Sequence, residues 1–294
     1  MKTTVERPEI PARREFLRGV GGVFVASAIA PHFSRAAGRD DFPFPIAVND
    51  RAAGFRQQLS AFAFARACGA SAVEVDLGRL GAAPGMINRL LDPNARRDFI
   101  QAAETSGVAI SSIALTAFED QPFSSHPKAE EYAEDLLYAL RTMNVATGVL
   151  PVDATDDYRT TLVVERLRRL APMAGVQGAT LAISAELPPA MLADLLDRVG
   201  SPAVAAAIVA RTGDDALGAM KIVGVKRIAQ IRYRHNPSMD DHADGLARLV
   251  VWLRESGWRG AFVIDRPAAV TGDTQADVSS AVQRLRGLFE PTYS

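Results

Sequence analysis

This sequence of 294 residues contains little cysteine, few aromatic side chains and almost no net charge. Cys68 is the only cysteine, which excludes an internal disulfide. Aromatic residues make up 7% of the chain, so a stacked platform for sugar rings is not expected. The 33 basic and 34 acidic residues nearly cancel, and the net charge of −1 leaves no footprint for nucleic acid. We therefore expect no nucleic-acid partner.

The N-terminal segment differs from the rest of the chain. Arg13 and Arg14 open a charged stretch, and residues 19–30 behind it are uncharged and rich in glycine and alanine. This order is typical of a secretory signal, and the paired arginines resemble a twin-arginine (Tat) signal, which exports folded proteins. We expect residues 1–38 to be a signal peptide and linker, the Tat machinery to be a partner, and the protein to be periplasmic.

The fate of this segment has two alternatives. Small residues favour cleavage after Ala28 or near Ala36 and Ala37, whereas Pro31 blocks a cut directly after Ala30. If the segment is retained, it would associate the protein with the membrane, although its apolar stretch is shorter than the roughly 20 residues that span a bilayer comfortably.

From residue 42 onward, short apolar runs alternate with longer amphipathic segments, as in a parallel sheet wrapped by helices. The expected strands are Phe44 to Asn49, Ala72 to Leu77, Val108 to Leu115, Val145 to Val152, Ala179 to Glu186, Val204 to Arg211, Arg227 to Arg234 and Gly260 to Arg266. The expected helices are Gly54 to Cys68, Pro93 to Ser106, Lys128 to Met143, Tyr158 to Ala174, Pro189 to Val199, Asp214 to Ile222, Asp241 to Ser256 and Ala276 to Phe289. This alternation predicts an α/β fold, a single (β/α)8 TIM barrel over residues 42–294.

Several fragments of this barrel resemble the xylose isomerase-like superfamily, also described as sugar phosphate isomerases/epimerases. They are Ala65 to Val75, Ser124-Ser125-His126-Pro127, Val176 to Ile183 and Lys226 to Ile231. Their order and spacing carry the resemblance together, and it covers nearly all of residues 44–290.

The resemblance implies a divalent metal held by a Glu on the fifth strand, an Asp on the sixth, a His on the seventh and a Glu on the eighth. In this sequence those positions fall on Ser184, Arg211, Arg232 and Asp265. Two of the four carry a fixed positive charge, which opposes a bound dication. We expect no metal and no other cofactor. In one alternative, the protein is an active, metal-dependent isomerase or epimerase whose metal ligands are Glu186, Asp265 and His235, at positions shifted from those that the resemblance implies.

Charged and polar side chains at the strand ends instead predict a pocket for a small polar metabolite, either a sugar or a sugar acid. Guanidinium groups that converge on a cavity suit carboxylates and phosphates. The candidate binding residues are Arg211, Arg232, Arg234, Gln230, Ser184 and His126. Glu74, Glu186 and Asp265 are the candidate catalytic bases for proton transfer, provided that burial raises a pKa among them.

A second interpretation stands beside this one. The acids and arginines nearly cancel, so they are also consistent with an ion-pair network that fills the barrel without chemistry. The protein would then be an accessory or structural subunit of a periplasmic or membrane-associated complex.

Overall fold

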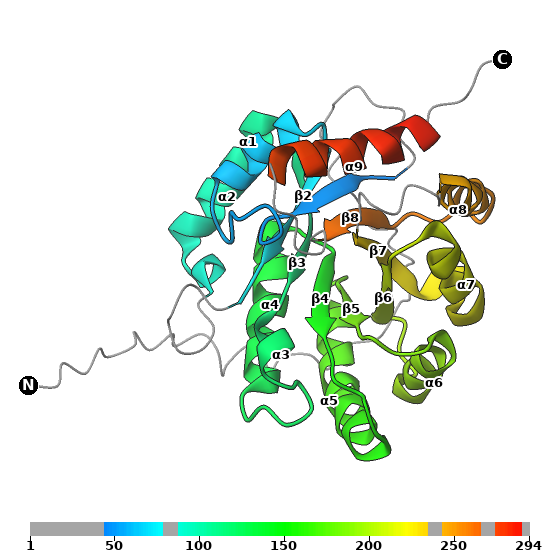
Figure 1. Ribbon diagram of the computed structural model, residues 1–294. Helices are drawn as coiled ribbons and strands as arrows, with labels where there is room; N and C mark the ends of the chain where they lie inside the picture. The colour runs from blue at the N-terminus through cyan, green and yellow to red at the C-terminus, as the bar shows by residue number, and fades with distance from the viewer. Residues whose placement is uncertain (1–43, 79–87, 235–242, 266–273, 290–294) are drawn as a thin grey trace, which may run out of the picture. The chain divides into compact units, whose positions relative to one another are not determined.

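The computed structural model describes residues 44–78, 88–234, 243–265 and 274–289 (Figure 1). Within them, parallel strands close into one barrel in the order β1-β2-β3-β4-β5-β6-β7-β8. The strands are β1 (Ile46–Asn49), β2 (Ala72–Asp76), β3 (Ala109–Ala114), β4 (Thr147–Pro151), β5 (Thr180–Ser184), β6 (Val204–Ala210), β7 (Ile228–Arg234) and β8 (Ala261–Asp265). The expected (β/α)8 barrel is confirmed.

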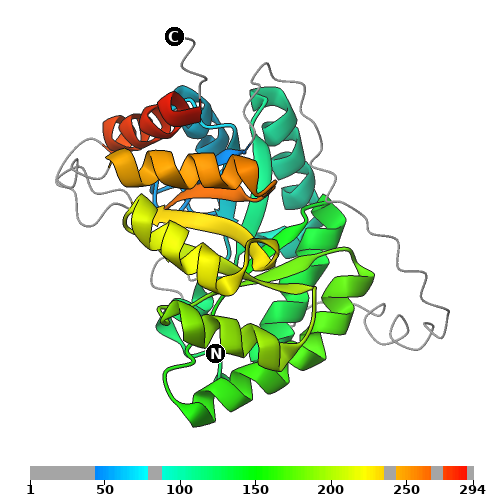
Figure 2. The same ribbon diagram turned by 90° about the vertical axis from the view of Figure 1, so that its right-hand side faces the viewer.

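Helices follow the strands and form the outer layer, as the two views show (Figures 1 and 2). They are α1 (Ser60–Ala67), α2 (Pro93–Ser106), α3 (Ala117–Asp120), α4 (Ala129–Met143), α5 (Asp157–Val176), α6 (Pro189–Val199), α7 (Gly213–Val223), α8 (Ala243–Glu255) and α9 (Thr274–Phe289), with short 3-10 turns η3 (Arg89–Leu91) and η4 (Val225–Arg227). The apolar faces of the helices pack on the barrel. Leu136, Leu137 and Leu140 of α4 are fully buried, as the spacing along that helix predicts.

The first helix begins later than the sequence predicts. We expected a helix from Gly54, but α1 starts at Ser60. The intervening chain turns instead, with a positive φ at Gly54 (83°) and at Gln57 (52°). The backbone N–H of Gln57 donates to Asp50 Oδ2 at 2.9 Å, so a buried carboxylate replaces the helical hydrogen bond there.

Small side chains line much of the barrel interior. One buried group is formed by Ala47, Ala72 and Val263, and another by Ala114, Val149, Ala182 and Ala207. Most TIM barrels fill this space with bulky branched residues. Here the alanines leave room for the long polar side chains described below.

β6 extends further along the barrel than its neighbour β5. β5 pairs with β6 through Leu181, Ala182 and Ile183, and the pairing ends at Ala206. β6 itself continues to Ala210 and pairs with β7 as far as Ala210↔Tyr233. On the β5 side, the last residues of β6 therefore lie beyond the end of the strand pairing.

The expected signal segment, residues 1–38, lies outside the described residues. Among the helices that the structure describes, none combines the length and the apolar character needed to cross a membrane.

Candidate functional site

A buried glutamate organises the interior of the barrel. Glu74 on β2 is fully buried, and its carboxylate accepts four hydrogen bonds. Asn49 Nδ2 and Arg232 Nη1 donate to Oε1 at 2.8 and 2.7 Å. Ser112 Oγ and Gln230 Nε2 donate to Oε2 at 2.8 and 2.9 Å. These donors, from β1, β3 and β7, occupy the carboxylate so fully that it serves as a fixed counterion.

Arg232 links this glutamate to the mouth of the barrel. Its side chain is 5% exposed, and its Nε lies 3.4 Å from Asp265 Oδ2 on β8. Burial alone would lower the pKa of Arg232, but the neighbouring Glu74 and Asp265 outweigh burial and raise it. The guanidinium therefore remains charged at every working pH.

The ion pairs continue outward through a second arginine on the same strand. Arg234 Nε lies 3.8 Å from Asp265 Oδ2, and Arg234 Nη1 donates to Glu186 Oε1 at 2.7 Å. This hydrogen bond lowers the pKa of Glu186. Glu186 is 72% exposed at its side chain, whereas Asp265 is 19% exposed, so solvent access increases along the series. Gln230, Arg232 and Arg234 thus share one face of β7, as strand alternation predicts.

The remaining predicted binding residues form no ion pair among the described residues, although the positive charge of Arg211 helps to lower the pKa of Glu186. Ser184 is the last residue of β5 and is partly exposed. We expected strands to reach Glu186 and Arg211, but β5 ends at Ser184 and β6 ends at Ala210, so both residues follow their strands. Arg211 is exposed and lines a cavity beside β6.

The described contacts of His126 stabilise the loop that precedes α4. Its Nδ1 accepts the backbone N–H of Lys128 at 3.1 Å, and its ring packs on Phe118 and Tyr132. Partial burial lowers the pKa of His126, which favours the neutral ring. These contacts support the loop before α4.

Asp50 and Asp76 form a second buried acidic pair, and neither was among the predicted catalytic or binding residues. Asp50 accepts the backbone N–H groups of Gln57 and Asp76. Asp76 Oδ1 accepts Thr116 Oγ1, and Arg56 Nε lies 2.5 Å from Asp76 Oδ2 in an ionic contact without hydrogen-bond alignment. The available signal was the position of both acids at the ends of the first two strands.

Burial shifts the protonation of both acids. It raises the pKa of Asp50 well above its usual value, and the charge of Asp76 adds to this effect. Burial also raises the pKa of Asp76 to about 6, although Thr116 and Arg56 oppose the shift. This pair ties the β1–α1 turn to β2.

The positions where the sequence resemblance placed metal ligands carry side chains that suit a dication poorly. Ser184 offers a hydroxyl group, Arg211 and Arg232 are cations, and Asp265 already lies against Arg232. Among the described residues, no group of three or more His, Cys, Asp or Glu side chains has the arrangement to hold a metal ion. The alternative ligand set includes His235, which lies outside the described residues.

No protein-family model and no curated protein matches the sequence. Solved structures match the fold. A D-psicose 3-epimerase with D-tagatose from Clostridium cellulolyticum H10 is 14% identical, with a TM-score of 0.60 over 84% of this chain and 99% of that one. The apo form of 3-keto-D-glucoside 4-epimerase from E. coli is 15% identical, with a TM-score of 0.63 over 83% and 99%.

A sugar phosphate isomerase/epimerase from Parabacteroides distasonis ATCC 8503 is 13% identical, with a TM-score of 0.63 over 86% of this chain and 98% of that one. At these identities the likeness concerns the fold. This chain therefore shares the barrel architecture of the xylose isomerase-like sugar isomerases and epimerases.

Proposed function

We propose that this protein is an exported barrel of sugar isomerase/epimerase type that binds a sugar or a sugar acid without a metal, with weak or no isomerase activity. The observation that carries the proposal is the series of arginines at the barrel mouth, with Arg232 where the superfamily has a histidine ligand. Solved structures of the same fold were obtained with D-tagatose and D-allulose, which supports a small sugar as the ligand.

The acids beside these arginines are poor bases in the arrangement observed. All the oxygens of Glu74 are engaged, and the hydrogen bond from Arg234 lowers the pKa of Glu186. A general base works best with a pKa near the working pH. Any remaining proton transfer would therefore depend on Asp265, which is partly exposed at the mouth.

Binding can be tested by thermal unfolding with D-galacturonate, D-gluconate and the neutral sugar D-galactose. We expect the sugar acids to raise the Tm more than the neutral sugar, because a carboxylate can pair with Arg234. A ligand present at 100 times its Kd adds about 2.7 kcal/mol to the free energy of unfolding.

The informative variant is Arg234→Ala, because Arg234 is partly exposed and can be removed without leaving Glu74 unpaired. It should abolish the rise in Tm. The matched control is Arg248→Ala, which removes an exposed arginine paired with Asp214 on the outer helices and should leave the rise intact. If none of the three compounds changes the Tm of the wild type, the binding proposal is wrong.

The metal-free part of the proposal needs a separate measurement. Elemental mass spectrometry of the purified protein should find no stoichiometric Mn, Zn, Mg or Co. One equivalent of any of them would support the alternative ligand set with Glu186, Asp265 and His235 instead.

A second candidate function is a non-catalytic subunit of a periplasmic or membrane-associated complex. The observation that favours it is the pairing of Glu74, Arg232, Asp265, Arg234 and Glu186 with one another, which leaves these charges mutually neutralised. Gentle purification from membranes should then recover a stable partner chain. A monodisperse monomer with no associated chain would contradict this candidate.

A further inference from the structure

We propose that the cavity between the β5–α6 connection and the end of β6 that extends beyond β5 binds a small organic monocarboxylate with an apolar body. This inference rests on the proposed function in one respect, because Arg211 is a candidate in both. Its ligand class is different, since the cavity is lined mainly by aliphatic side chains rather than by sugar-binding polar groups.

The cavity has a volume of about 390 Å³. This value lies within the usual range for small-molecule sites, about 300–1,000 Å³. Its lining residues come from the β5–α6 connection, α6, β6 and α7: Ala185, Leu187, Pro189, Leu192, Ala207, Ile208, Val209, Arg211, Asp215 and Ala219.

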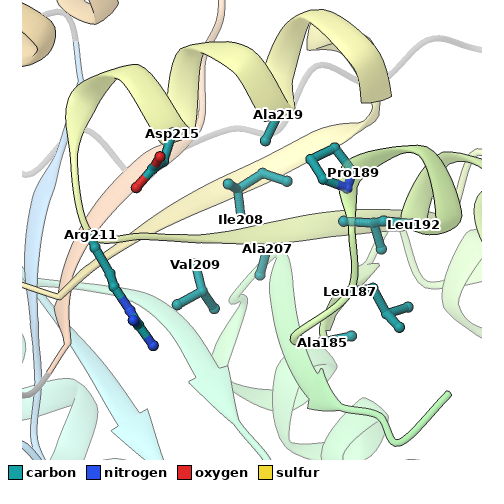
Figure 3. A pocket seen from close by; sticks show the side chains of 10 residues that line it. All are labelled: Ala185, Leu187, Pro189, Leu192, Ala207, Ile208, Val209, Arg211, Asp215 and Ala219. Atoms are coloured by element: carbon teal, nitrogen blue, oxygen red, sulfur yellow. The ribbon is translucent and has the colours of Figure 1, made fainter. Parts of the chain in front are cut away.

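The apolar and charged parts of the cavity are segregated. Figure 3 shows Leu187, Pro189 and Leu192 at one end and Arg211 with Asp215 at the other, with β6 running between them. A ligand with one apolar end and one charged end matches this arrangement.

The end of β6 forms one wall of the cavity. Ala207, Ile208 and Val209 line the cavity, and they lie beyond the residues of β6 that pair with β5, while their pairing with β7 continues.

Arg211 selects the charge of the ligand. Arg232 and Arg234 are held by acidic partners within 4 Å. Arg211 is exposed and forms no ion pair with any of the described residues, although its charge helps to lower the pKa of Glu186. A guanidinium presents paired donors that match a carboxylate. Asp215 is exposed at the same end of the cavity, on the other side of the β6 ribbon from the Arg211 side chain (Figure 3), and its negative charge disfavours a second anionic group on the ligand.

Isothermal titration calorimetry with 3-phenylpropionate tests this site directly. We expect saturable binding, at least tenfold weaker binding of the neutral 3-phenylpropan-1-ol, and weaker binding of the dianion phenylsuccinate. Equal affinity for the acid and the alcohol would overturn the role of Arg211, and absence of binding would overturn the site.

Variants separate the two ends of the cavity. Arg211→Gln should weaken 3-phenylpropionate binding at least tenfold, whereas the control Arg248→Gln should leave it unchanged. Ala185→Phe should weaken it by filling the apolar end from a partly exposed connection. Asp215→Asn should strengthen it a few-fold. Circular dichroism confirms that each variant is folded, and wild-type affinity in both Arg211→Gln and Ala185→Phe would contradict the proposal.

The result is distinguishable from the test of the proposed function. Binding of 3-phenylpropionate that survives Arg234→Ala, together with no response to D-galacturonate, would support this site and contradict the sugar-acid proposal. A response to D-galacturonate alone would do the opposite.

Discussion

Arg232 and Glu74 show what a buried charge requires of its neighbours. Their side chains are 5% and 0% exposed, and Arg232 Nη1 lies 2.7 Å from Glu74 Oε1. Removing both partners of such a pair is often tolerated, but removing one leaves an uncompensated charge in the interior. Each member of the pair is therefore needed for stability as long as the other is present, whether or not either one contacts a ligand.

We predict that Arg232→Met lowers the free energy of unfolding by about 3–5 kcal/mol, because Glu74 then loses its counterion. The double variant Glu74→Gln/Arg232→Met should recover most of this loss. Urea unfolding measures both values. The exposed pair supplies a control, since Arg248→Met should leave the free energy of unfolding nearly unchanged. A double variant as unstable as the single one would contradict this account.

Asp76 gives stability a pH dependence of its own. Its folded-state pKa is about 6 and its ordinary value is 3.8, so the folded state binds the proton more tightly. Stability from this group is fully present below pH 3.8 and is lost as the pH rises through 6. The predicted contribution is about 3 kcal/mol.

The measurement compares wild type with Asp76→Asn, which cannot titrate. The difference between their free energies of unfolding should shift in favour of wild type as the pH falls from 7 to 5. A pH-independent difference would show that Asp76 does not carry this proton.

At the scale of elements, α7 and α8 approach closely where two glycines meet. A Cβ added to Gly213 would lie 2.3 Å from Gly245 C and 2.3 Å from Leu246 N, both backbone atoms that cannot rotate away. Arg248 and Asp214 then join the same two helices at the surface. The contact fixes the position of α7, which contributes Asp215 and Ala219 to the cavity beside β6.

We predict that Gly213→Ala destabilises the protein by about 1–3 kcal/mol, because the helices must separate to admit the methyl group. Gly218→Ala on the same helix is the matched control, since an added Cβ there meets nothing within 4 Å. It should stabilise by about 0.5–1 kcal/mol through helix propensity. Thermal unfolding of the two variants should move in opposite directions, and a shift in the same direction would refute the steric argument.

For the whole molecule, export is the prediction with the broadest consequence. Replacing Arg13 and Arg14 together by lysine should retain the protein in the cytoplasm, because the arginine pair is the recognised feature of a Tat signal. Arg18→Lys changes the same charged stretch outside the pair and should leave export unchanged. Immunoblots of periplasmic and cytoplasmic fractions measure this. Unaltered export after loss of the pair would reject the Tat assignment.

Much of the barrel could be predicted from the sequence, because period-two apolar runs and amphipathic helices are local patterns. The face shared by Gln230, Arg232 and Arg234 also followed from alternation along one strand. The start of α1 was wrong because Asp50 holds the backbone of Gln57 from across a turn. The predicted ends of β5 at Glu186 and of β6 at Arg211 were also too late, since β5 ends at Ser184 and β6 at Ala210. A strand ends where its hydrogen-bonded pairing with a neighbouring strand ends, and the local sequence does not show that point.

The order of the elements, the closed barrel and the arginines near the strand ends can all be predicted from the amino-acid sequence, because each depends on local residue type and spacing. The three-dimensional fold sets which charges neutralise one another. It surrounded Glu74 with donors from β1, β3 and β7, left Arg211 without an ion pair among the described residues, and opened a cavity where β5 and β6 part. These features depend on contacts between residues far apart in the chain, and no local pattern encodes such distances.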